Sequence, residues 1–430
     1  MTLKLLKYYL SLLYWSRASV AAVKRMQLRK FRELFEHARR NSRFYREFYG
    51  DHGLLELEIT SEEDIRRVPL VNKGLLREHP LQDIMTRPMD PSVRIHHTSG
   101  STGEPFAIAF SEFEDYSAHV RLMKALGEAG YTPMRKMVLL SRYEPGHEFA
   151  IESDLKQIGW WREKLGLFRR ELISIFDPVE TIIRKLETAK PYAVWSTPSI
   201  IEVIALALQK ADRKLDIPLV LFMSETVTPA LIALFRERIG REFIDLFGCM
   251  ESPAIGFGIN QIETKKLFSN TTLVEVVIPK PERGLLFGDL VITNLINHTM
   301  PIIRYDLGDR VEVLERESFP VREIGRIHGR SDDIIYFGGR YTLTYHQSYQ
   351  LFRAFHECLQ YRFIERAAGE IVLQLRIDDR ADREQVKKSA LLKWEEKYPG
   401  YPLTIEWKNE LPIDRKTGKF KVIERFHHSA

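Results

Sequence analysis

Hydrophobic and polar positions follow two alternating spacings between residues 177 and 248. Apolar residues recur three and four positions apart in three segments, which predicts helices over 178–189, 198–214 and 229–240. Three short apolar runs, YAVW, PLVLFM and EFIDLF, predict strands over 192–195, 218–223 and 242–247. Strands joined by helices of this length imply right-handed crossovers, so we expect a parallel sheet.

The rest of the chain is richer in strand patterns. VRIHH (93–97) and PFAIAF (105–110) predict strands on either side of a loop, and 288–313 predicts two β-rich runs that end at a turn at Asp309, with a third beginning at Arg310. We therefore expect an α/β fold with a large N-terminal domain over 1–330, which holds the parallel sheet, a β-rich subdomain and a basic helical leader (1–50). A small, mobile α+β domain follows over 331–430.

Polar residues follow each predicted strand of the parallel sheet, at the edge where open α/β sheets bind ligands. They are Ser196–Ser199, Ser224–Thr226 and Gly248–Ser252. The spacing brings Glu225 and Glu251 to the same edge, where one carboxylate suits Mg²⁺ shared with a phosphate ligand. The alternative is that each acid lies at a helix N-terminus, where the helix dipole favours it. At Asp309 the choice is between a ribose-binding carboxylate and a turn aspartate that bonds its own backbone.

The segment HHTSGSTGEP, residues 96–105, concentrates small hydroxyl and glycine residues between two predicted strands. Such a loop suits phosphate, because backbone N–H groups approach an anion closely where no Cβ intervenes. It is not a Walker A motif, since no lysine follows Gly103. An ordinary turn is the alternative. His96 and His97 are adjacent on a strand and face opposite sides, which argues against a shared metal.

Composition indicates a globular protein, with 44% hydrophobic and 29% charged residues and a formal net charge of +5. Twelve basic residues fall between Lys4 and Arg46, and only Glu33 and Glu36 oppose them, so the remainder gives no support for nucleic acid as a partner. The apolar N-terminus is too interrupted to span a bilayer. It predicts either an amphipathic helix on an anionic membrane or a helix packed on the large domain with a solvated basic face. Two cysteines allow no disulfide framework, which favours the cytoplasm.

Six segments in this order resemble the adenylate-forming superfamily of acyl-CoA synthetases: TSGSTGEP, SETVTP, FGCMES, MPIIRYDLGD, GRSDD and KTGKFK. The stretches LFEHARRNSRFYREFY and LEITSEEDIRRVPLVNKGLLRE further resemble the phenylacetate-CoA ligase family, in its branch associated with capsular polysaccharide biosynthesis. The resemblance covers about residues 24 to 426. It implies ATP, Mg²⁺ and, with less support, CoA as cofactors, and a small carboxylic acid as substrate.

The resemblance also implies roles for individual residues. The loop would hold the ATP phosphates through Thr98, Ser99, Gly100, Ser101, Thr102 and Gly103. Ser224, Glu225, Thr226, Phe247 and Gly248 would border the adenine, Asp309 would bind the ribose, and Arg330 would lie near the ribose or phosphate. Glu251 would bind Mg²⁺, Asp332 would be the hinge, and Lys419 would bridge the substrate carboxylate and the α-phosphate. Lys419, Glu251 and Thr98 are the implied catalytic residues.

Three departures from the family pattern qualify these roles. Phe247 stands where tyrosine is common, GGRYTLT replaces the usual turn beyond the hinge, and the insertion that carries cysteine and histidine in many relatives has no cysteine here. We therefore expect no structural zinc, and the CoA step is less firmly implied than adenylation. Cys249 lies in a motif but has no basic neighbour in sequence to activate it.

The substrate and the acyl acceptor stay open at this point. An aromatic set near the sheet edge suits an aryl or short acyl acid, although any member could belong to the core: Tyr143, Trp195, Ser196, Phe222 and Ile255. The acceptor is CoA in the leading hypothesis and an amine or hydroxyl, for instance on a sugar precursor, in the second. In the third hypothesis, the protein is a non-catalytic relative that binds a nucleotide. The oligomeric state is not predicted.

Overall fold

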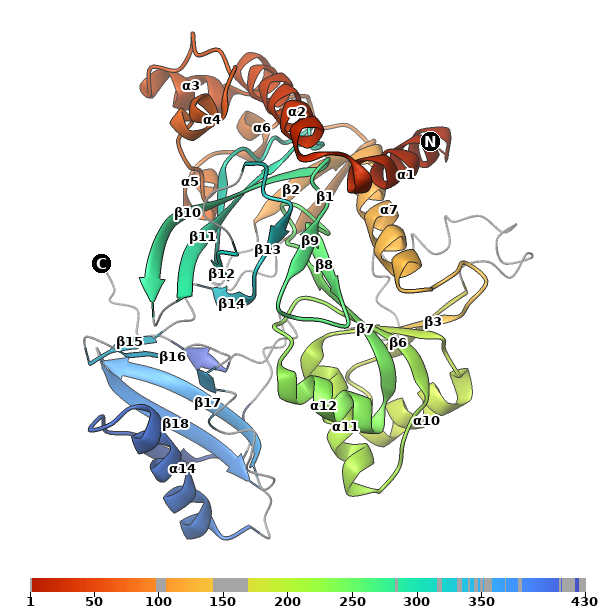
Figure 1. The fold of residues 1–430 in the computed structure, drawn as a ribbon, viewed down its shortest axis with the longest axis vertical. Helices are drawn as coiled ribbons and strands as arrows, with labels where there is room; N and C mark the ends of the chain where they lie inside the picture. The colour runs from red at the N-terminus through yellow and green to blue at the C-terminus, as the bar shows by residue number, and fades with distance from the viewer. Residues whose placement is uncertain are drawn as a thin grey trace. The chain divides into compact units, whose positions relative to one another are not determined.

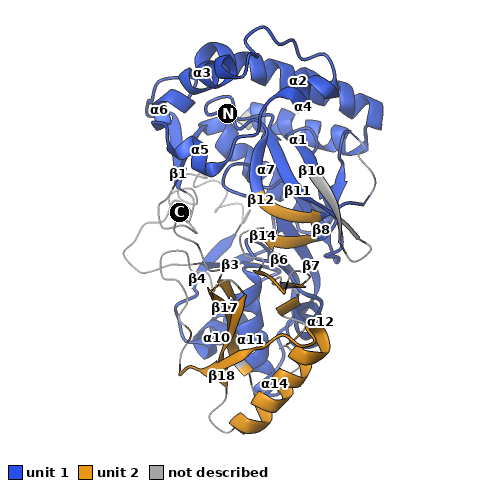
Figure 2. Cartoon of the chain, turned by 90° about the vertical axis from the view of Figure 1, so that its left-hand side faces the viewer, with its two compact units in different colours: residues 1–307, 312–326 blue, residues 308–311, 327–430 orange. Residues whose placement is uncertain are grey.

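The computed structural model describes residues 2–97, 106–141, 169–282, 285–314, 319–330, 335–338, 341–343, 347–348, 351, 358–367, 369–377, 381–409, 411 and 422–424. They group into two compact units, residues 1–307 with 312–326 and residues 308–311 with 327–430 (Figure 2). The predicted hinge residue Asp332 lies outside the described residues, and the domain boundary after residue 330 stays a prediction.

Helices dominate the N-terminal part of the first unit and recur between its strands (Figure 1). Their bounds are α1 (Thr2–Arg17), α2 (Val20–Asn41), α3 (Arg43–Asp51), α4 (Glu62–Arg67), α5 (Lys73–Arg77), α6 (Leu81–Ile84), α7 (Glu112–Glu128), α10 (Val179–Ala189), α11 (Pro198–Lys210) and α12 (Pro229–Arg238). Local side chains begin several of them. Ser19 caps α2, and Ser61 and Asp64 form a reciprocal capping box at α4.

The strands of the central sheet are β3 (Met137–Ser141), β4 (Arg170–Ser174), β5 (Ala193–Ser196), β6 (Ile217–Phe222), β7 (Gly240–Phe247), β8 (Gly256–Ile259), β9 (Lys265–Leu267) and β13 (Glu323–Ile324). Their order is β13-β9-β8-β7-β6-β5-β3-β4. The five strands from β4 to β7 are parallel, and β8, β9 and β13 add an antiparallel edge. The predicted α/β fold with a parallel sheet is thus confirmed.

Both faces of the sheet are covered by helices, and side chains alternate between them along each strand. Val138, Val194 and Val220 pack with α10, α11 and α12 on one face. Leu139 and Leu219 pack on the other face with α7 and with α1 of the distant N-terminus. Strands buried on both faces read as continuous apolar runs, which explains the pattern of PLVLFM.

Two antiparallel pairs complete the first unit. β1 (Val93–His97) pairs with β2 (Ala107–Ser111), which confirms the strands expected around the loop. β10 (Thr272–Glu282) pairs with β11 (Leu285–Asn294). Ser111 ends β2 and caps α7 in a capping box with Glu114. A buried Glu114 also accepts N–H bonds from His298 and Thr299, and so ties α7 to the chain beyond β11.

The second unit contains a mixed sheet in the order β19-β18-β17-β20 with α14 (Arg383–Lys397) packed on it. Its strands are β17 (Cys358–Ala367), β18 (Glu370–Ile377), β19 (Thr404–Trp407) and β20 (Ile423–Glu424), with a separate hairpin of β15 (Ile335–Phe337) and β16 (Tyr341–Leu343). Trp394 of α14 lies between Phe337 and Phe363, with ring centroids 5.6 and 5.7 Å away. Such aromatic packing gives this small α+β unit a core of its own.

The prediction that Asp309 lies at a turn was wrong. Asp309 lies inside β12 (Tyr305–Glu312), opposite Arg330 of β14 (Ile327–Arg330), and not at a turn. Gly308 beside it has a φ of 69°, and the pairing is irregular between Asp309 and Val311. This bulge bends the strand where the sequence suggested a break. Gly240, expected to close a helix, instead begins β7, because α12 ends at Arg238.

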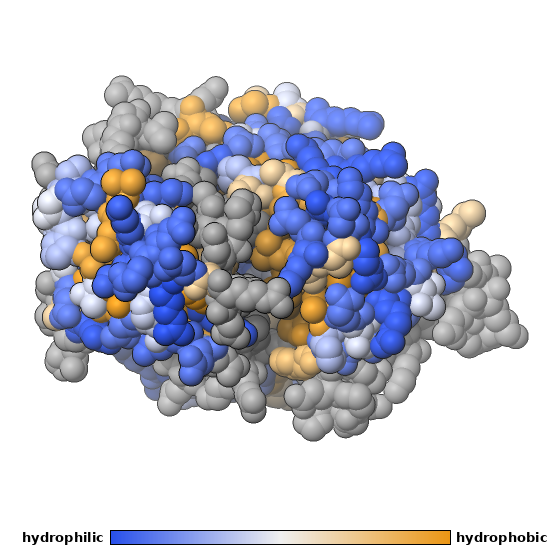
Figure 3. All heavy atoms as spheres, turned by 90° about the horizontal axis from the view of Figure 1, so that it is seen from below, coloured by the Kyte–Doolittle hydropathy of each residue, from blue (hydrophilic) through white to orange (hydrophobic). Residues whose placement is uncertain are grey.

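The surface in Figure 3 is mostly hydrophilic, with small groups of hydrophobic residues between polar ones. Among the helices that the structure describes, none has the length and apolar content needed to cross a bilayer.

Candidate active site

The candidate site is built from the loops that follow the parallel strands, and the loop after β7 is held by contacts within itself. Ile255 donates a backbone N–H to the carbonyl of Phe247 at 2.8 Å, so the loop closes on itself within eight residues. A Cβ on Gly248 would lie 2.5 Å from the backbone nitrogen of Ala254. Position 248 therefore has to be glycine for the loop to adopt this path.

The loop carries Glu251 in a buried position, with 6% of the residue exposed. Tyr305 donates its hydroxyl hydrogen to Oε1 of Glu251 at 2.8 Å, and the Asn294 amide donates to the Glu251 backbone carbonyl at 3.0 Å. Side chain and backbone are thus both fixed. A carboxylate oriented in this way presents a preorganised oxygen ligand for a hard cation.

A second set of hydrogen bonds, from Arg121, holds the C-terminal end of the same loop. Arg121 of α7 is buried and donates to the backbone carbonyls of Pro253, at 3.0 Å, and Ala254, at 3.1 Å. Its Nη2 also donates to the Pro253 carbonyl, and its Nη1 donates to the hydroxyls of Tyr8, at 2.8 Å, and Ser117, at 3.1 Å. The N-terminal helix therefore supports the Glu251 loop through Arg121, a connection that no motif in the sequence indicates.

Arg304 fixes the start of the strand that supplies Tyr305. Its guanidinium makes two bonds to the Glu275 carboxylate, at 2.9 and 3.0 Å, and donates to the backbone carbonyls of Arg66, at 2.8 Å, and Val68. A buried guanidinium that makes two hydrogen bonds to one carboxylate allows only one relative orientation of the two groups. Tyr305 and Arg304 are functional candidates that the sequence interpretation did not single out, although both lie inside the MPIIRYDLGD segment.

Glu225 lies beyond the end of β6, but its carboxylate has a structural partner. Oε2 accepts the backbone N–H of Ser199 at 2.9 Å, and Oε1 accepts the Ser199 hydroxyl at 3.0 Å. Ser199 is in the first turn of α11, so Glu225 caps the neighbouring helix. This is the alternative that the sequence left open for Glu225. Ser224 before it has a φ of 69°, a strained conformation for a residue with a Cβ.

The described residues of the predicted substrate pocket do not form one group. Phe222 is fully buried in the core beneath α11 and α12, where its ring contacts Phe235 and Phe243. Trp195 packs on the opposite face of the sheet and donates its indole N–H to the sulfur of Met223. Ser196 and Ile255 are also buried, and the Ser196 hydroxyl is without a hydrogen-bond partner in the part of the chain that the structure describes.

The remaining predicted site residues fall into two groups. Thr226, Phe247 and Gly248 lie in the first unit, beyond β6 or at the end of β7. Asp309 and Arg330 lie in the second unit and are register partners in the backbone pairing of β12 with β14. Outside the described residues lie the Ser/Thr/Gly loop (Thr98, Ser99, Gly100, Ser101, Thr102 and Gly103), Tyr143, Asp332 and Lys419.

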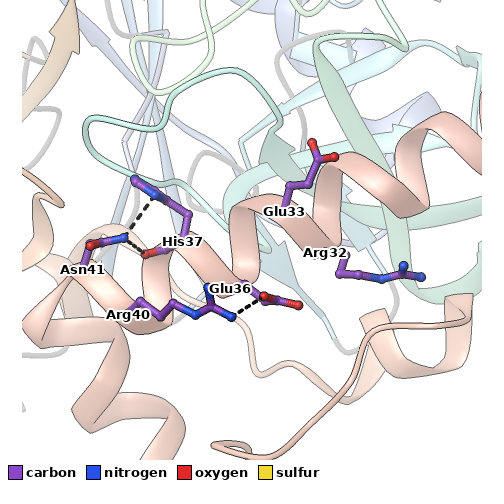
Figure 4. Close-up of a pocket in the computed structure, with 6 residues that line it drawn as sticks. All are labelled: Arg32, Glu33, Glu36, His37, Arg40 and Asn41. Carbon is purple, nitrogen blue, oxygen red and sulfur yellow. Dashed lines mark hydrogen bonds and ion pairs between the residues drawn. The ribbon is translucent and has the colours of Figure 1, made fainter.

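A separate depression of about 310 Å³ runs along α2 and contains no predicted site residue (Figure 4). Its lining is polar: Arg32, Glu33, Glu36, His37, Arg40 and Asn41. Arg40 pairs with Glu36 at 2.8 Å, and Asn41 bonds the His37 ring at 3.1 Å, so these side chains satisfy one another. The arrangement is that of a solvated helix face.

Known proteins resemble this chain in both sequence and fold. It is 24% identical to the phenylacetate-coenzyme A ligase of Pseudomonas putida over 331 residues, which cover 75% of this chain and 74% of the relative. It is 23% identical to Protein CapK of Staphylococcus aureus over 388 residues, which cover 87% and 82%. No family model matches the chain.

Among solved structures, 2-hydroxyisobutyryl-CoA ligase in the postadenylation state aligns with a TM-score of 0.67 and 18% identity over 89% of this chain and 85% of that one. The same ligase with 2-HIB-AMP and CoA in the thioesterification state aligns with a TM-score of 0.56 and 19% identity over 95% and 91%. At these identities the solved structures show the fold. Together with the curated relatives, they confirm the resemblance of this chain to the phenylacetate-CoA ligase family of adenylate-forming enzymes.

Proposed function

We propose that the protein is an AMP-forming acid–thiol ligase, which activates a carboxylic acid with ATP to an acyl-AMP, releases pyrophosphate and transfers the acyl group to CoA. Relatives named as phenylacetate-coenzyme A ligases support this proposal, as do acyl-CoA ligases that share its fold. One observation in this chain carries the proposal. The Glu251 carboxylate, in the loop after β7, is buried and is held by a hydrogen bond from the Tyr305 hydroxyl.

Glu251 fits magnesium by its donor chemistry. Mg²⁺ takes oxygen ligands, keeps several waters, and commonly uses one or two carboxylates together with substrate phosphates. A single buried carboxylate whose orientation is set by a tyrosine meets that requirement. When bound, the ion would neutralise charge on the ATP phosphates. The residues of this chain would hold and orient it through Glu251 and Tyr305.

Nucleotide binding rests on the remaining motif residues. We assign the ATP phosphates to Thr98, Ser99, Gly100, Ser101, Thr102 and Gly103, and the adenine edge to Ser224, Thr226, Phe247 and Gly248. The pairing of Asp309 with Arg330 across β12 and β14 supports a joint role at the ribose and phosphate. Glu225 would act on the adenine edge indirectly, by holding the first turn of α11.

Lys419 would supply the charge that the reaction needs. A carboxylate attacking the α-phosphate brings two anions together, so catalysis depends on positioning and on neutralising developing negative charge. We assign this task to Lys419, with Asp332 as the hinge of a C-terminal domain over 331–430 that turns between the two half-reactions. A cytoplasmic location, inferred from the low cysteine content, is part of the same proposal.

The acceptor has two candidates. CoA is supported by the phenylacetate-CoA ligase relatives. An amine or hydroxyl acceptor is the candidate if the chain follows the polysaccharide branch that its sequence resembles; the match to Protein CapK covers 87% of this chain. Product analysis with CoA, holo-carrier protein and amino acceptors separates them, because only the true acceptor yields an acylated product.

The experiment that tests activation itself is a panel of aryl and short-chain acids, assayed for pyrophosphate release with and without CoA. We expect release only with a matching acid and with Mg²⁺. Calorimetry with Mg-ATP distinguishes the third candidate, a non-catalytic binding protein. Binding of Mg-ATP without turnover of any acid would favour it, whereas acid-dependent release excludes it.

A further inference from the structure

The N-terminal helix α1 is apolar on two opposite faces. Its inner face places Tyr8 and Leu12 in the core beside α7, and the Tyr8 ring meets Phe113 edge-on at 5.8 Å. Its outer face carries a row of exposed apolar side chains at helical spacing: Leu3 at 65%, Leu6 at 54%, Leu10 at 55% and Tyr14 at 64% exposure. A helix that only covers the domain requires one apolar face, so the second needs its own explanation.

The outer row is held on a fixed helix. α1 runs beside α7 (Figure 1), and besides the Tyr8 contact with Arg121, Ser11 accepts from the Asn270 amide at 3.2 Å. Arg322 donates to the carbonyls of Ser16, at 3.2 Å, and Ala18, at 2.9 Å. The row is thus displayed by the folded protein, and it does not depend on a loose tail.

The charged side chains of α1 itself are all of one sign. Lys4, Lys7 and Arg17 are exposed on the same helix, and no acidic residue precedes Glu33 in the sequence. An apolar row flanked by cations complements a surface that combines negative charge with an apolar interior. A second copy fits less well, because a two-fold contact through α1 would bring the same cations against one another.

We propose that the outer face of α1, formed by Leu3, Leu6, Leu10 and Tyr14 with Lys4, Lys7 and Arg17, docks the protein on anionic phospholipid membranes. The leucines and the tyrosine enter the boundary between headgroups and acyl chains, and the cations meet lipid phosphates. The inner face keeps its contacts with α7 throughout.

Sedimentation of the full chain with lipid vesicles tests this surface. We expect binding to vesicles of phosphatidylglycerol and phosphatidylcholine, weaker binding as salt rises, and little binding to phosphatidylcholine alone. Leu6→Gln with Leu10→Gln lowers the partition coefficient by about tenfold or more, because two exposed leucines lose their apolar contact. Lys4→Gln with Lys7→Gln also lowers it, by roughly 25-fold, at roughly fivefold for each charge.

The matched control replaces exposed apolar residues elsewhere. Val203 and Leu392 lie on α11 and α14 and are 52% and 62% exposed, so Val203→Gln with Leu392→Gln leaves vesicle binding unchanged. Thermal unfolding by circular dichroism confirms that each variant folds. Failure to bind anionic vesicles, or equal binding by the Leu6/Leu10 variant, overturns the proposal. So does a dimer in sedimentation equilibrium that this variant dissociates, because a second copy would then cover the face.

Discussion

Tyr305 and Glu251 are 54 residues apart in sequence, and the Tyr305 hydroxyl donates a 2.8 Å hydrogen bond to Oε1 of the Glu251 carboxylate. Both side chains are buried. The bond leaves the carboxylate one orientation, and hydrogen bonds to charged groups contribute about 1.5–3 kcal/mol. The proposed magnesium ligand is therefore positioned by a residue from the segment that also supplies Asp309.

Replacing Tyr305 with phenylalanine removes that bond and keeps the ring. We expect Tyr305→Phe to lower the rate of acid-dependent ATP–pyrophosphate exchange by about 10- to 100-fold and to raise the Mg²⁺ concentration needed for half-maximal exchange. A Mg²⁺ titration of the exchange rate measures both effects. Tyr131→Phe is the control, because the Tyr131 hydroxyl donates to the backbone carbonyl of the nearby Arg135, at 2.9 Å, and not to Glu251. Equal Mg²⁺ dependence in the two variants would contradict the positioning role.

Removing the Glu225 carboxylate tests whether it acts as a helix cap. Glu225→Ala takes away both acceptors of Ser199, so we expect the free energy of unfolding to fall by about 1 kcal/mol. Urea unfolding followed by circular dichroism measures the change. Unchanged stability together with lost ATP binding would instead make Glu225 a direct nucleotide ligand.

Gly248 and Gly127 form a matched pair of glycine substitutions. Gly248→Ala places a Cβ against the Ala254 backbone, so we expect loss of exchange activity and a lower melting temperature. Gly127 lies in α7, and a Cβ there meets nothing within 4 Å, so Gly127→Ala is neutral or stabilises by up to about 1 kcal/mol. Full activity of Gly248→Ala would show that the loop tolerates another path.

The lowered pKa of Lys30 predicts that the stability of the protein depends on pH. Burial, followed by the neighbouring charge of Arg29, lowers the pKa of Lys30 to about 8, and its ammonium donates to the Asn270 carbonyl at 2.6 Å. An unfolded lysine keeps its proton to about pH 10.4, so between these values the unfolded chain binds more protons and stability rises with pH. Relative to Lys30→Met, the free energy of unfolding of the wild type should rise by about 1–2 kcal/mol from pH 8 to pH 10. Urea unfolding at each pH measures it, and a constant difference would contradict the lowered pKa.

The sequence predicted the parallel sheet because the three strands β5, β6 and β7 are short apolar runs separated by two helical segments, α11 and α12. It did not reveal which face a side chain joins. Phe222 and Trp195 were grouped as pocket candidates, yet they pack on opposite faces, and a strand buried on both sides has no polar alternation to distinguish them.

The pattern of hydrophobic and polar positions does not indicate contacts between segments that are far apart in the sequence. The Tyr8–Arg121–Pro253 connection joins three segments through a buried guanidinium, and buried arginine looks like a solvated residue in a sequence. Asp309 was misplaced because Gly308 is typical of turns, whereas here its positive φ accommodates a bulge within β12. Glycine favours unusual backbone conformations in turns and in β-bulges alike, so its presence does not distinguish a turn from a bulge.

The most direct test of the account is acid-dependent ATP–pyrophosphate exchange by the wild type, Glu251→Gln and Lys419→Ala, each with its fold checked by circular dichroism. The account predicts that an acid from the panel supports exchange by the wild type, that Glu251→Gln needs far more Mg²⁺, and that Lys419→Ala abolishes exchange while the fold is kept. Exchange by Lys419→Ala at the wild-type rate would contradict it.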